Sequence, residues 1–189
     1  FFDIETDGLN ATKVHCICAM LDDGESTVYN FIGGEANGLF RKWLASESVD
    51  TLVGHNIINF DVPILRRLTG MDWAFNLRDT LVLSRLHNPS LDGGHSLRSW
   101  GERLGNYKDD YQGGWEEYSH EMLTYCQQDV RVTKILYEHL KFTSEQFHTK
   151  QEKLKMKKIT INTKEYSRTK IKNNILRVYD VALHKEKND

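Results

Sequence analysis

The first ten residues, FFDIETDGLN, contain an Asp-x-Glu pair, Asp3 and Glu5, set between apolar neighbours. Apolar and acidic residues alternate here, which is typical of a β-strand on which residues two apart share one face. Two carboxylates side by side repel each other, so burying them is costly unless a cation neutralises them. Oxygen ligands without Cys or His suit hard ions such as Mg²⁺ or Mn²⁺. The stretch therefore predicts a strand with a candidate metal site, although a solvated strand edge gives the same pattern.

The rest of the chain alternates between strand-like and helix-like patterns. The apolar periodicity predicts strands at residues 1–5, 14–21, 26–31 and 51–53, and helices around Phe40 and Leu44 and at residues 62–68, 79–86, 96–104 and 120–140. The pair Asp7-Gly8 predicts a turn between the first two strands. Hairpins followed by alternating helices and strands indicate a mixed α/β sheet.

The composition describes a globular protein. The chain has 189 residues, of which 39% are hydrophobic and 28% charged, and this length favours one domain with a small appendage. Its mean hydropathy is −0.57, and it contains no run of about 18 apolar residues and no signal-peptide pattern. We therefore expect neither a membrane span nor secretion.

The net charge of −2 conceals two unlike parts. Residues 1–148 contain 13 Lys and Arg against 22 Asp and Glu, whereas residues 149–189 contain 12 against 5. We therefore predict a domain at 1–148 and a basic C-terminal tail at 149–189. The tail includes a helix-compatible stretch at 150–158, a brief strand at 159–162, and a short amphipathic helix whose apolar positions run from Ile171 to Ala182.

Cysteine usage argues against both a disulfide framework and a zinc site. The chain has three cysteines, Cys16, Cys18 and Cys126, which is an odd number. His15 lies next to Cys16, but no second Cys/His pair completes a zinc ligand set. We expect free cysteines in a core.

Two further stretches carry candidate catalytic residues. Asn56 to Asp61 follows a predicted strand and precedes a predicted helix, so Asp61 is either a helix-capping acid or a site residue. Tyr125 and Asp129 are four residues apart in a predicted helix and share one face. A buried Tyr beside a surface Asp is the alternative interpretation of that pair.

Together, the three stretches resemble the three motifs of the DEDD 3′–5′ exonucleases, and the tyrosine at 125 indicates the DEDDy branch. The first motif matches Phe2 to Thr6, the second Asn56 to Asp61, and the third Tyr125 to Asp129. The proofreading domain of DNA polymerases from short-tailed phages is similar over about residues 1–141, including the segments 14–16, 55–63, 79–86, 95–97, 100–105, 107–110 and 128–134.

The resemblance implies a ribonuclease-H-like fold, with a mixed five-stranded sheet flanked by helices and four acids gathered at one edge. It implies that Asp3, Glu5 and Asp129 hold one divalent ion, Mg²⁺ or Mn²⁺. Asp3 and Asp61 would hold a second, with Asp61 acting through water. Tyr125 would orient the attacking water.

The resemblance also implies contacts to the substrate strand. Leu9, four residues after Glu5, matches an apolar wedge against the terminal bases, and Phe60 could add an aromatic face. Thr6 and Asn56 would contact the terminal nucleotide. A turn residue that caps the core is the alternative interpretation of Leu9.

We therefore expect a metal-dependent 3′–5′ DNA exonuclease that releases 5′-mononucleotides from single-stranded or frayed ends. The expected partners are DNA and a polymerase or another replication protein, in the cytoplasm of a phage-infected bacterium. A 3′–5′ exoribonuclease and a non-catalytic nucleic-acid-binding or polymerase-accessory module are the alternatives. The presence of all four acids and the tyrosine argues against the non-catalytic module.

The tail is the one strongly basic segment, and we expect it to contribute to nucleic-acid binding. A solvated face or a partner-docking helix is the alternative. Residues 142–189 are too few for a polymerase domain. Both a standalone exonuclease and a piece of a larger protein remain open.

Overall fold

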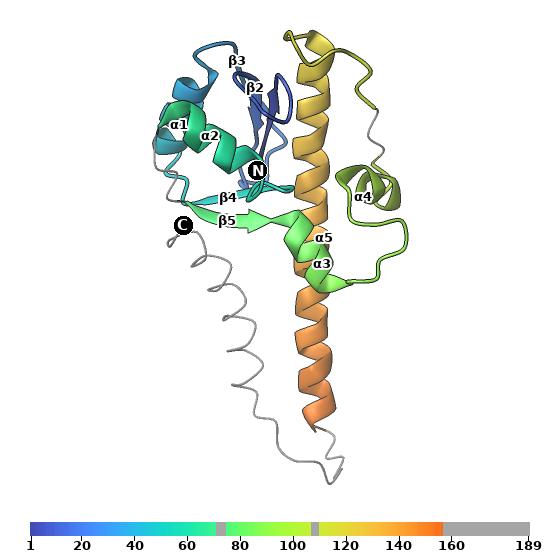
Figure 1. Cartoon of the computed structure of the whole chain (residues 1–189). Coiled ribbons are helices and arrows are strands. Elements are labelled where there is room, and N and C mark those ends of the chain that lie inside the picture. Colours follow the sequence, from blue (N-terminus) through green and yellow to red (C-terminus); the bar gives the residue numbers. More distant parts are fainter. Residues whose placement is uncertain (71–74, 107–109, 157–189) are drawn as a thin grey trace, which may run out of the picture. The chain divides into compact units, whose positions relative to one another are not determined.

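The computed structural model describes residues 1–70, 75–106 and 110–156 (Figure 1). Of residues 142–156, only the helical backbone is described. The chain divides into two units, Phe1–Thr149 and Lys150–Asp189. The strand and the amphipathic helix expected within the tail lie outside the described residues. The division into an exonuclease domain and a basic tail stays a prediction.

Three antiparallel strands form the first sheet, in the order β1-β2-β3. They are β1 (Phe2–Thr6), β2 (Val14–Ala19) and β3 (Tyr29–Ile32). The turn between β1 and β2 forms around Asp7, whose Oδ1 accepts hydrogen bonds from two backbone N–H groups at 2.7 and 3.1 Å. The first two predicted strands are therefore confirmed, and the third begins three residues later than expected.

The expected single sheet of five strands is not observed. In the described residues, β4 (Thr51–Gly54) and β5 (Asn76–Asp79) pair in parallel as a second, two-stranded sheet. The end of β4 approaches the backbone of β1, because a Cβ on Gly54 would lie 3.0 Å from the Phe2 carbonyl oxygen. Ladder hydrogen bonds do not extend across this approach in the described part of the chain. The sequence predicts which residues are strands, but not whether two strand edges meet in register.

Five helices surround the sheets in the described residues: α1 (Ala36–Ser46), α2 (Asp61–Thr69), α3 (Thr80–His87), α4 (Leu97–Arg103) and α5 (His120–Met156). Each lies where the periodicity predicts a helix, although α5 continues well past residue 140. The ends of the shorter helices have local causes. Ser96 caps α4 with its side-chain oxygen, and α2 ends at Gly70, which has a left-handed φ of 61°. None of the described helices is long and apolar enough to cross a membrane.

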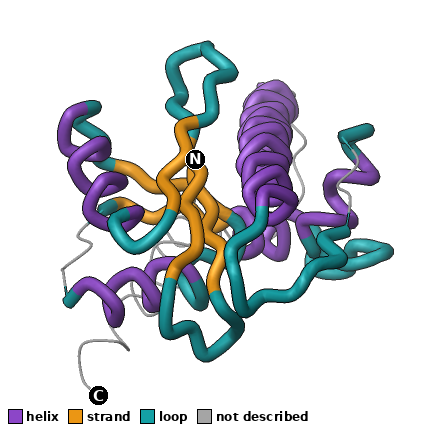
Figure 2. Tube along the Cα trace, turned by 90° about the horizontal axis from the view of Figure 1, so that it is seen from above, coloured by secondary structure: helices purple, strands orange, loops and turns teal. Residues whose placement is uncertain are grey.

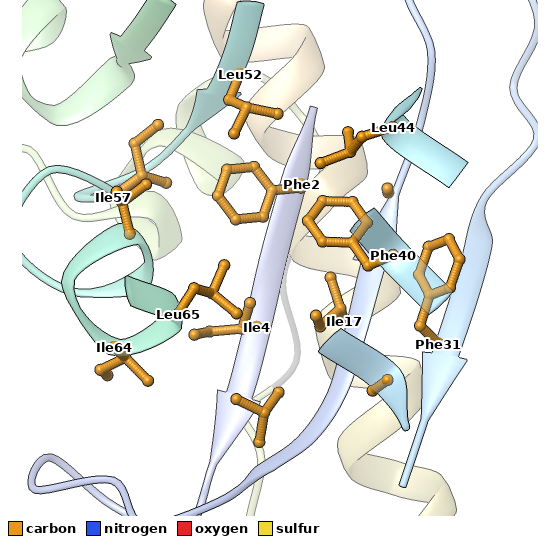
Figure 3. Close-up of a cluster of buried hydrophobic side chains, with 14 of the residues drawn as sticks. Phe2, Ile4, Ile17, Phe31, Phe40, Leu44, Leu52, Ile57, Ile64 and Leu65 are labelled. Atoms are coloured by element: carbon orange, nitrogen blue, oxygen red, sulfur yellow. The ribbon is translucent and has the colours of Figure 1, made fainter. Parts of the chain in front are cut away.

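The main core lies on one face of the first sheet, against α1 and α2 (Figure 3). Its centre is an aromatic contact between Phe2 of β1 and Phe40 of α1, with ring centroids 5.6 Å apart. Ile4, two residues after Phe2, points to the same core, as the alternation predicts. Asp3 and Glu5 are therefore placed on the opposite face of β1.

That opposite face of the sheet packs against α5 (Figure 2). Cys16 and Cys18 of β2 lie there with Cys126 of α5, and all three are buried and free, as expected. Residues of α4, including Trp100, pack farther along α5 in a third cluster. The two acids of β1 thus lie in the layer between the sheet and α5.

Candidate active site

Asp3 and Glu5 lie where β1 meets α5. Glu5 is only 6% exposed and Asp3 is half-buried, so the pair is not a solvated strand edge. One ligand atom from each of Asp3, Glu5 and Cys126 lies within 4.8 Å of the other two. The Sγ of Cys126 donates a hydrogen bond to the Asp3 carbonyl oxygen at 3.5 Å. Cys126 therefore marks where α5 contacts the acid-bearing face of β1.

The third motif lies on this same helix. Asp129 follows Cys126 by three residues, so both lie on the helix face that meets the sheet. Asp129 is 6% exposed, whereas Tyr125 is half-buried. These exposures are the opposite of the alternative interpretation, in which a buried Tyr lies beside a surface Asp. The structure thus brings Asp129 toward the acids of β1.

Asp61 supplies a fourth carboxylate from the first turn of α2. It is 2% exposed, and its Oδ1 has no hydrogen-bond partner among the described residues. Burial is the main cause that raises its pKa from 3.8 to about 7, and the charges of Asp79 and Asp129 raise it further. Backbone N–H groups of Ile4 and of Asp61 itself oppose that shift. The contact with the Ile4 backbone, next in sequence to both Asp3 and Glu5, places Asp61 against β1.

Four carboxylates from β1, α2 and α5 therefore face the contact between these elements: Asp3 and Glu5 lie against Cys126 of α5, and Asp61 lies against β1 within electrostatic reach of Asp129. The sequence separates them by as many as 126 positions, and the packing of the two helices on either side of β1 brings them together. Such a cluster is unfavourable when every member is ionised and no cation is present. The arrangement suits a divalent cation.

Comparison with known proteins agrees with these motifs. The chain is 31% identical to the DNA-directed DNA polymerase of Enterobacteria phage T3, and the match covers 73% of this chain and 26% of the polymerase. It is 32% identical to the DNA-directed DNA polymerase of Escherichia phage T7, with the same coverage of each chain. This chain is related to phage DNA polymerases. It spans about a quarter of the length of the curated relatives it matches, and no protein-family model matches it. The resemblance to phage polymerases indicated by the motifs is confirmed.

In this polymerase relative, the residues expected to contact the substrate strand differ from one another in exposure. Leu9 is 87% exposed, which argues against the alternative interpretation that it caps the core. Thr6 is buried, and its hydroxyl donates to the Gly8 carbonyl oxygen at 2.9 Å. Phe60 is half-buried and packs partly against the main core. Leu9 is thus the most accessible member of the set, and Asn56 is half-buried like Phe60.

Asp79 is a positioning residue that the motifs did not single out for a role. It ends β5, is 3% exposed, and accepts hydrogen bonds from the Leu81 and Val82 N–H groups as the N-cap of α3. It also accepts from the Asn56 N–H at 2.9 Å and the Ile58 N–H at 3.1 Å. One carboxylate therefore joins the second motif to the start of α3.

The segment held by the Asp79 carboxylate has an unusual backbone conformation. Asn56 has a left-handed φ of 65°, which non-glycine residues adopt rarely. The neighbouring His55 Nδ1 lies 2.9 Å from the Thr80 hydroxyl, which also donates to the Gly54 carbonyl oxygen at 3.2 Å. The sequence signal for this arrangement was the pair Asp79-Thr80 at the start of a predicted helix. That pattern by itself predicts only a helix cap.

Arg98 and Lys108 are basic residues that could contact phosphate, and Arg98 is engaged by other acids. Arg98 of α4 forms ion pairs with Glu102, at 3.3 Å, and with Asp110. Lys108, another basic residue of this region, lies outside the described residues. Arg98 is therefore not a strong candidate for contacting phosphate.

Proposed function

We propose that the protein is a metal-dependent 3′–5′ exonuclease that acts on DNA. The observation that supports the proposal is that Asp3 and Glu5 lie against Cys126 of α5, while the buried Asp61 contacts β1 and feels the charge of Asp129. The relationship to phage DNA polymerases favours DNA over RNA as the substrate. The order and spacing of the motifs are those of the DEDDy exonucleases that the chain resembles.

The strand arrangement supports a ribonuclease-H-like fold for this proposal. The first sheet has the order β3-β2-β1, β4 approaches the free edge of β1, and β5 pairs with β4. Joining the two sheets at that approach would yield one mixed sheet in the order 3-2-1-4-5. The four acids then lie at and beside its central strand.

The donor set fits hard divalent ions. The four acids offer only carboxylate oxygens, which Mg²⁺ and Mn²⁺ prefer. Burial raises the pKa of the Cys126 thiol well above its usual range, so this thiol stays protonated and is a poor ligand at neutral pH. The Asp61 Oδ1, buried without a hydrogen-bond partner among the described residues, fits a cation ligand.

We assign the acids to two ions on the pattern of the family. Asp3, Glu5 and Asp129 would hold one, and Asp3 and Asp61, the latter through water, would hold the other. Two bound ions lower the pKa of a water nucleophile and stabilise the leaving oxygen of a phosphodiester. The protein fixes the carboxylates from three separate elements, so their separation is preset before substrate binds.

Side chains around the cluster orient the water and the strand. Tyr125, one helical turn before Asp129, orients the attacking water through its hydroxyl. Leu9 wedges against the terminal bases and Phe60 adds an aromatic face, while Asn56 and Thr6 hold the terminal nucleotide by its polar groups. Stacking of this kind contributes about 1–3 kcal/mol per base and tolerates any sequence.

The test is a gel assay with matched DNA and RNA oligonucleotides labelled at the 5′ end, in Mg²⁺, Mn²⁺ or EDTA. We expect stepwise shortening of single-stranded DNA from its 3′ end, dependence on metal, and loss of activity in Asp3→Ala. Faster digestion of RNA would favour the exoribonuclease alternative. Digestion that survives in EDTA or in Asp3→Ala would refute the metal mechanism. Binding without any digestion by the wild type would favour a non-catalytic accessory module.

A further inference from the structure

Three aromatic rings meet at Tyr125 of α5, one helical turn before Asp129. Tyr111 and Trp115 lie in residues 110–119, the segment before α5 that we name the strap. Their ring centroids are 4.8 Å apart, and those of Tyr111 and Tyr125 are 5.9 Å apart. Trp115 meets Tyr125 edge to face at 6.5 Å. Edge-to-face contacts of this kind favour one relative orientation of the rings. Tyr125 therefore has two aromatic neighbours from the strap.

The strap is attached at its middle and at its C-terminal end. His15 of β2 is 4% exposed, and its Nε2 lies 2.8 Å from the Trp115 carbonyl oxygen. A carbonyl oxygen only accepts, so His15 donates this hydrogen bond. At the C-terminal end, the Ser119 hydroxyl accepts from the Met122 N–H at 3.0 Å in the first turn of α5. The Tyr111 hydroxyl lies 3.2 Å from that of Ser119.

Attachment to β2 relates the strap to the acids of β1. His15 is followed on β2 by Cys16, which pairs with Glu5 across the antiparallel ladder. The strap is thus held by the strand that pairs with the acid-bearing strand. Movement of the Trp115 backbone away from β2 would require breaking the hydrogen bond from His15.

Tyr125 also has open space beside it. It borders a cavity of about 770 Å³ together with Thr124 and Gln128 of α5 and residues 110–113 of the strap. A half-buried tyrosine next to such a space can adopt more than one rotamer unless its ring is held. The Trp115 ring does not line this cavity, so it contacts Tyr125 from elsewhere.

The charge of the strap argues against a direct contact with a nucleic-acid backbone. Glu116 and Glu117 follow Trp115, and Asp110 begins the segment. Glu117 pairs with Lys13 at 3.4 Å, and both side chains are exposed. Phosphates would be repelled by this acidic face. The aromatic side chains of the strap are therefore better suited to act on Tyr125 than on a strand.

We propose that the strap positions Tyr125, with Trp115 and Tyr111 holding its ring and His15 holding the strap. The proposal rests on the proposed exonuclease function, in which Tyr125 orients the attacking water. It makes Trp115, Tyr111 and His15 positioning residues that act through Tyr125 and do not touch the substrate.

Steady-state kinetics test the proposal through the division between kcat and KM. For Trp115→Ala we expect kcat to fall by about tenfold or more with an unchanged KM for a single-stranded oligonucleotide, as a displaced catalytic group does. Trp115→Phe keeps an aromatic ring and should recover most of the loss. Tyr118→Ala removes another exposed aromatic side chain of the strap and should leave both constants within about twofold. A raised KM with unchanged kcat would overturn positioning in favour of strand binding.

A double-mutant cycle tests whether Trp115 acts through Tyr125. If it does, Trp115→Ala added to Tyr125→Phe causes no further loss of kcat, because the hydroxyl to be positioned is already absent. Losses that multiply would overturn the proposal. Thermal unfolding of each variant identifies a loss that comes from misfolding. His15→Gln retains an N–H donor and should be milder than His15→Leu, which cannot donate.

A readout independent of activity separates this proposal from the proposed function. Fluorotyrosine placed at position 125 reports the ring environment by ¹⁹F NMR, whether or not the protein degrades DNA. We expect Trp115→Ala to shift or broaden the resonance and Tyr118→Ala to leave it unchanged. An unchanged resonance in Trp115→Ala would overturn positioning even in an active exonuclease. A shifted resonance in a protein without exonuclease activity would refute only the proposed function.

Discussion

Asp61 shows how burial of one carboxyl group links metal, pH and stability. Its pKa is raised from 3.8 to about 7, mainly by burial, so the folded protein without metal favours the protonated form. A raised carboxyl pKa stabilises the fold fully below the unfolded value, and this contribution is lost as pH rises through about 7. A cation bound at Asp61 would replace the proton.

The corresponding prediction concerns Asp61→Asn in EDTA. As the pH rises from about 4 to about 8, ionisation of Asp61 should lower the free energy of unfolding of the wild type by up to about 4 kcal/mol. Asp61→Asn has no carboxyl group at this position, so its free energy of unfolding should not show this decline. Urea denaturation at several pH values measures it. Asp92→Asn, an exposed control, should behave like the wild type. A decline of equal size in Asp61→Asn would contradict the prediction.

Asp79 is the second residue whose burial matters, because it accepts hydrogen bonds from two segments. Asp79→Ala leaves buried N–H groups of the second motif unsatisfied, so we expect a loss of about 2–4 kcal/mol in the free energy of unfolding. Metal-dependent digestion should fall as well, because the segment leads to Asp61. Urea denaturation and the gel assay measure the two effects. Asp92→Ala should change stability by no more than about 0.5 kcal/mol. An Asp79→Ala variant as stable as the wild type would exclude this role.

At the scale of elements, the sequence predicts where most helices and strands lie, because their periodicity is local. It missed β5, whose residues Asn76-Leu77-Arg78-Asp79 contain a single apolar side chain. The strand exists because β4 supplies a parallel partner for its backbone. The three-plus-two division of the sheet was also not predicted, since it depends on how the edges of β1 and β4 meet.

The close approach of β4 to β1 leads to a prediction for Gly54. A Cβ at this position would clash with the Ile57 side chain and lie 3.0 Å from the Phe2 carbonyl oxygen. We expect Gly54→Ala to lower the free energy of unfolding by about 1–3 kcal/mol, as overpacking does. Gly38→Ala in α1 is the matched control, because its Cβ would meet nothing within 4 Å, and helix propensity should stabilise it by about 0.5–1 kcal/mol. Equal effects from thermal or urea denaturation would contradict the packing argument.

At the scale of the whole molecule, charge is divided between an acidic part and a basic part. The acid cluster accounts for 4 of the 22 acidic residues at 1–148, so bound cations would offset part of the negative charge. The described ion pairs of Arg98 further reduce the local positive charge open to phosphates. Residues 149–189 therefore stay the predicted source of attraction for a nucleic acid.

The prediction for the tail is a change in salt dependence. Deletion of residues 150–189 should weaken binding to a single-stranded oligonucleotide and make the slope of log affinity against log salt shallower by about 1 or more. Fluorescence anisotropy at several salt concentrations measures both quantities. A full-length variant with the tail Lys and Arg replaced by Gln separates charge from length. Unchanged affinity and slope in both variants would exclude a binding role for the tail.

The sequence by itself determined the types and spacing of the candidate site residues and the relationship to phage DNA polymerases. It could do so because the alternation around Asp3 and Glu5, and the four-residue spacing of Tyr125 and Asp129, are local properties of a strand and a helix. Only the tertiary structure decided that Asp61 is buried against β1, that Asp79 holds the second motif, and that aromatic rings of the strap surround Tyr125. Those facts depend on which surfaces of distant elements pack together, and packing is a property of the folded chain.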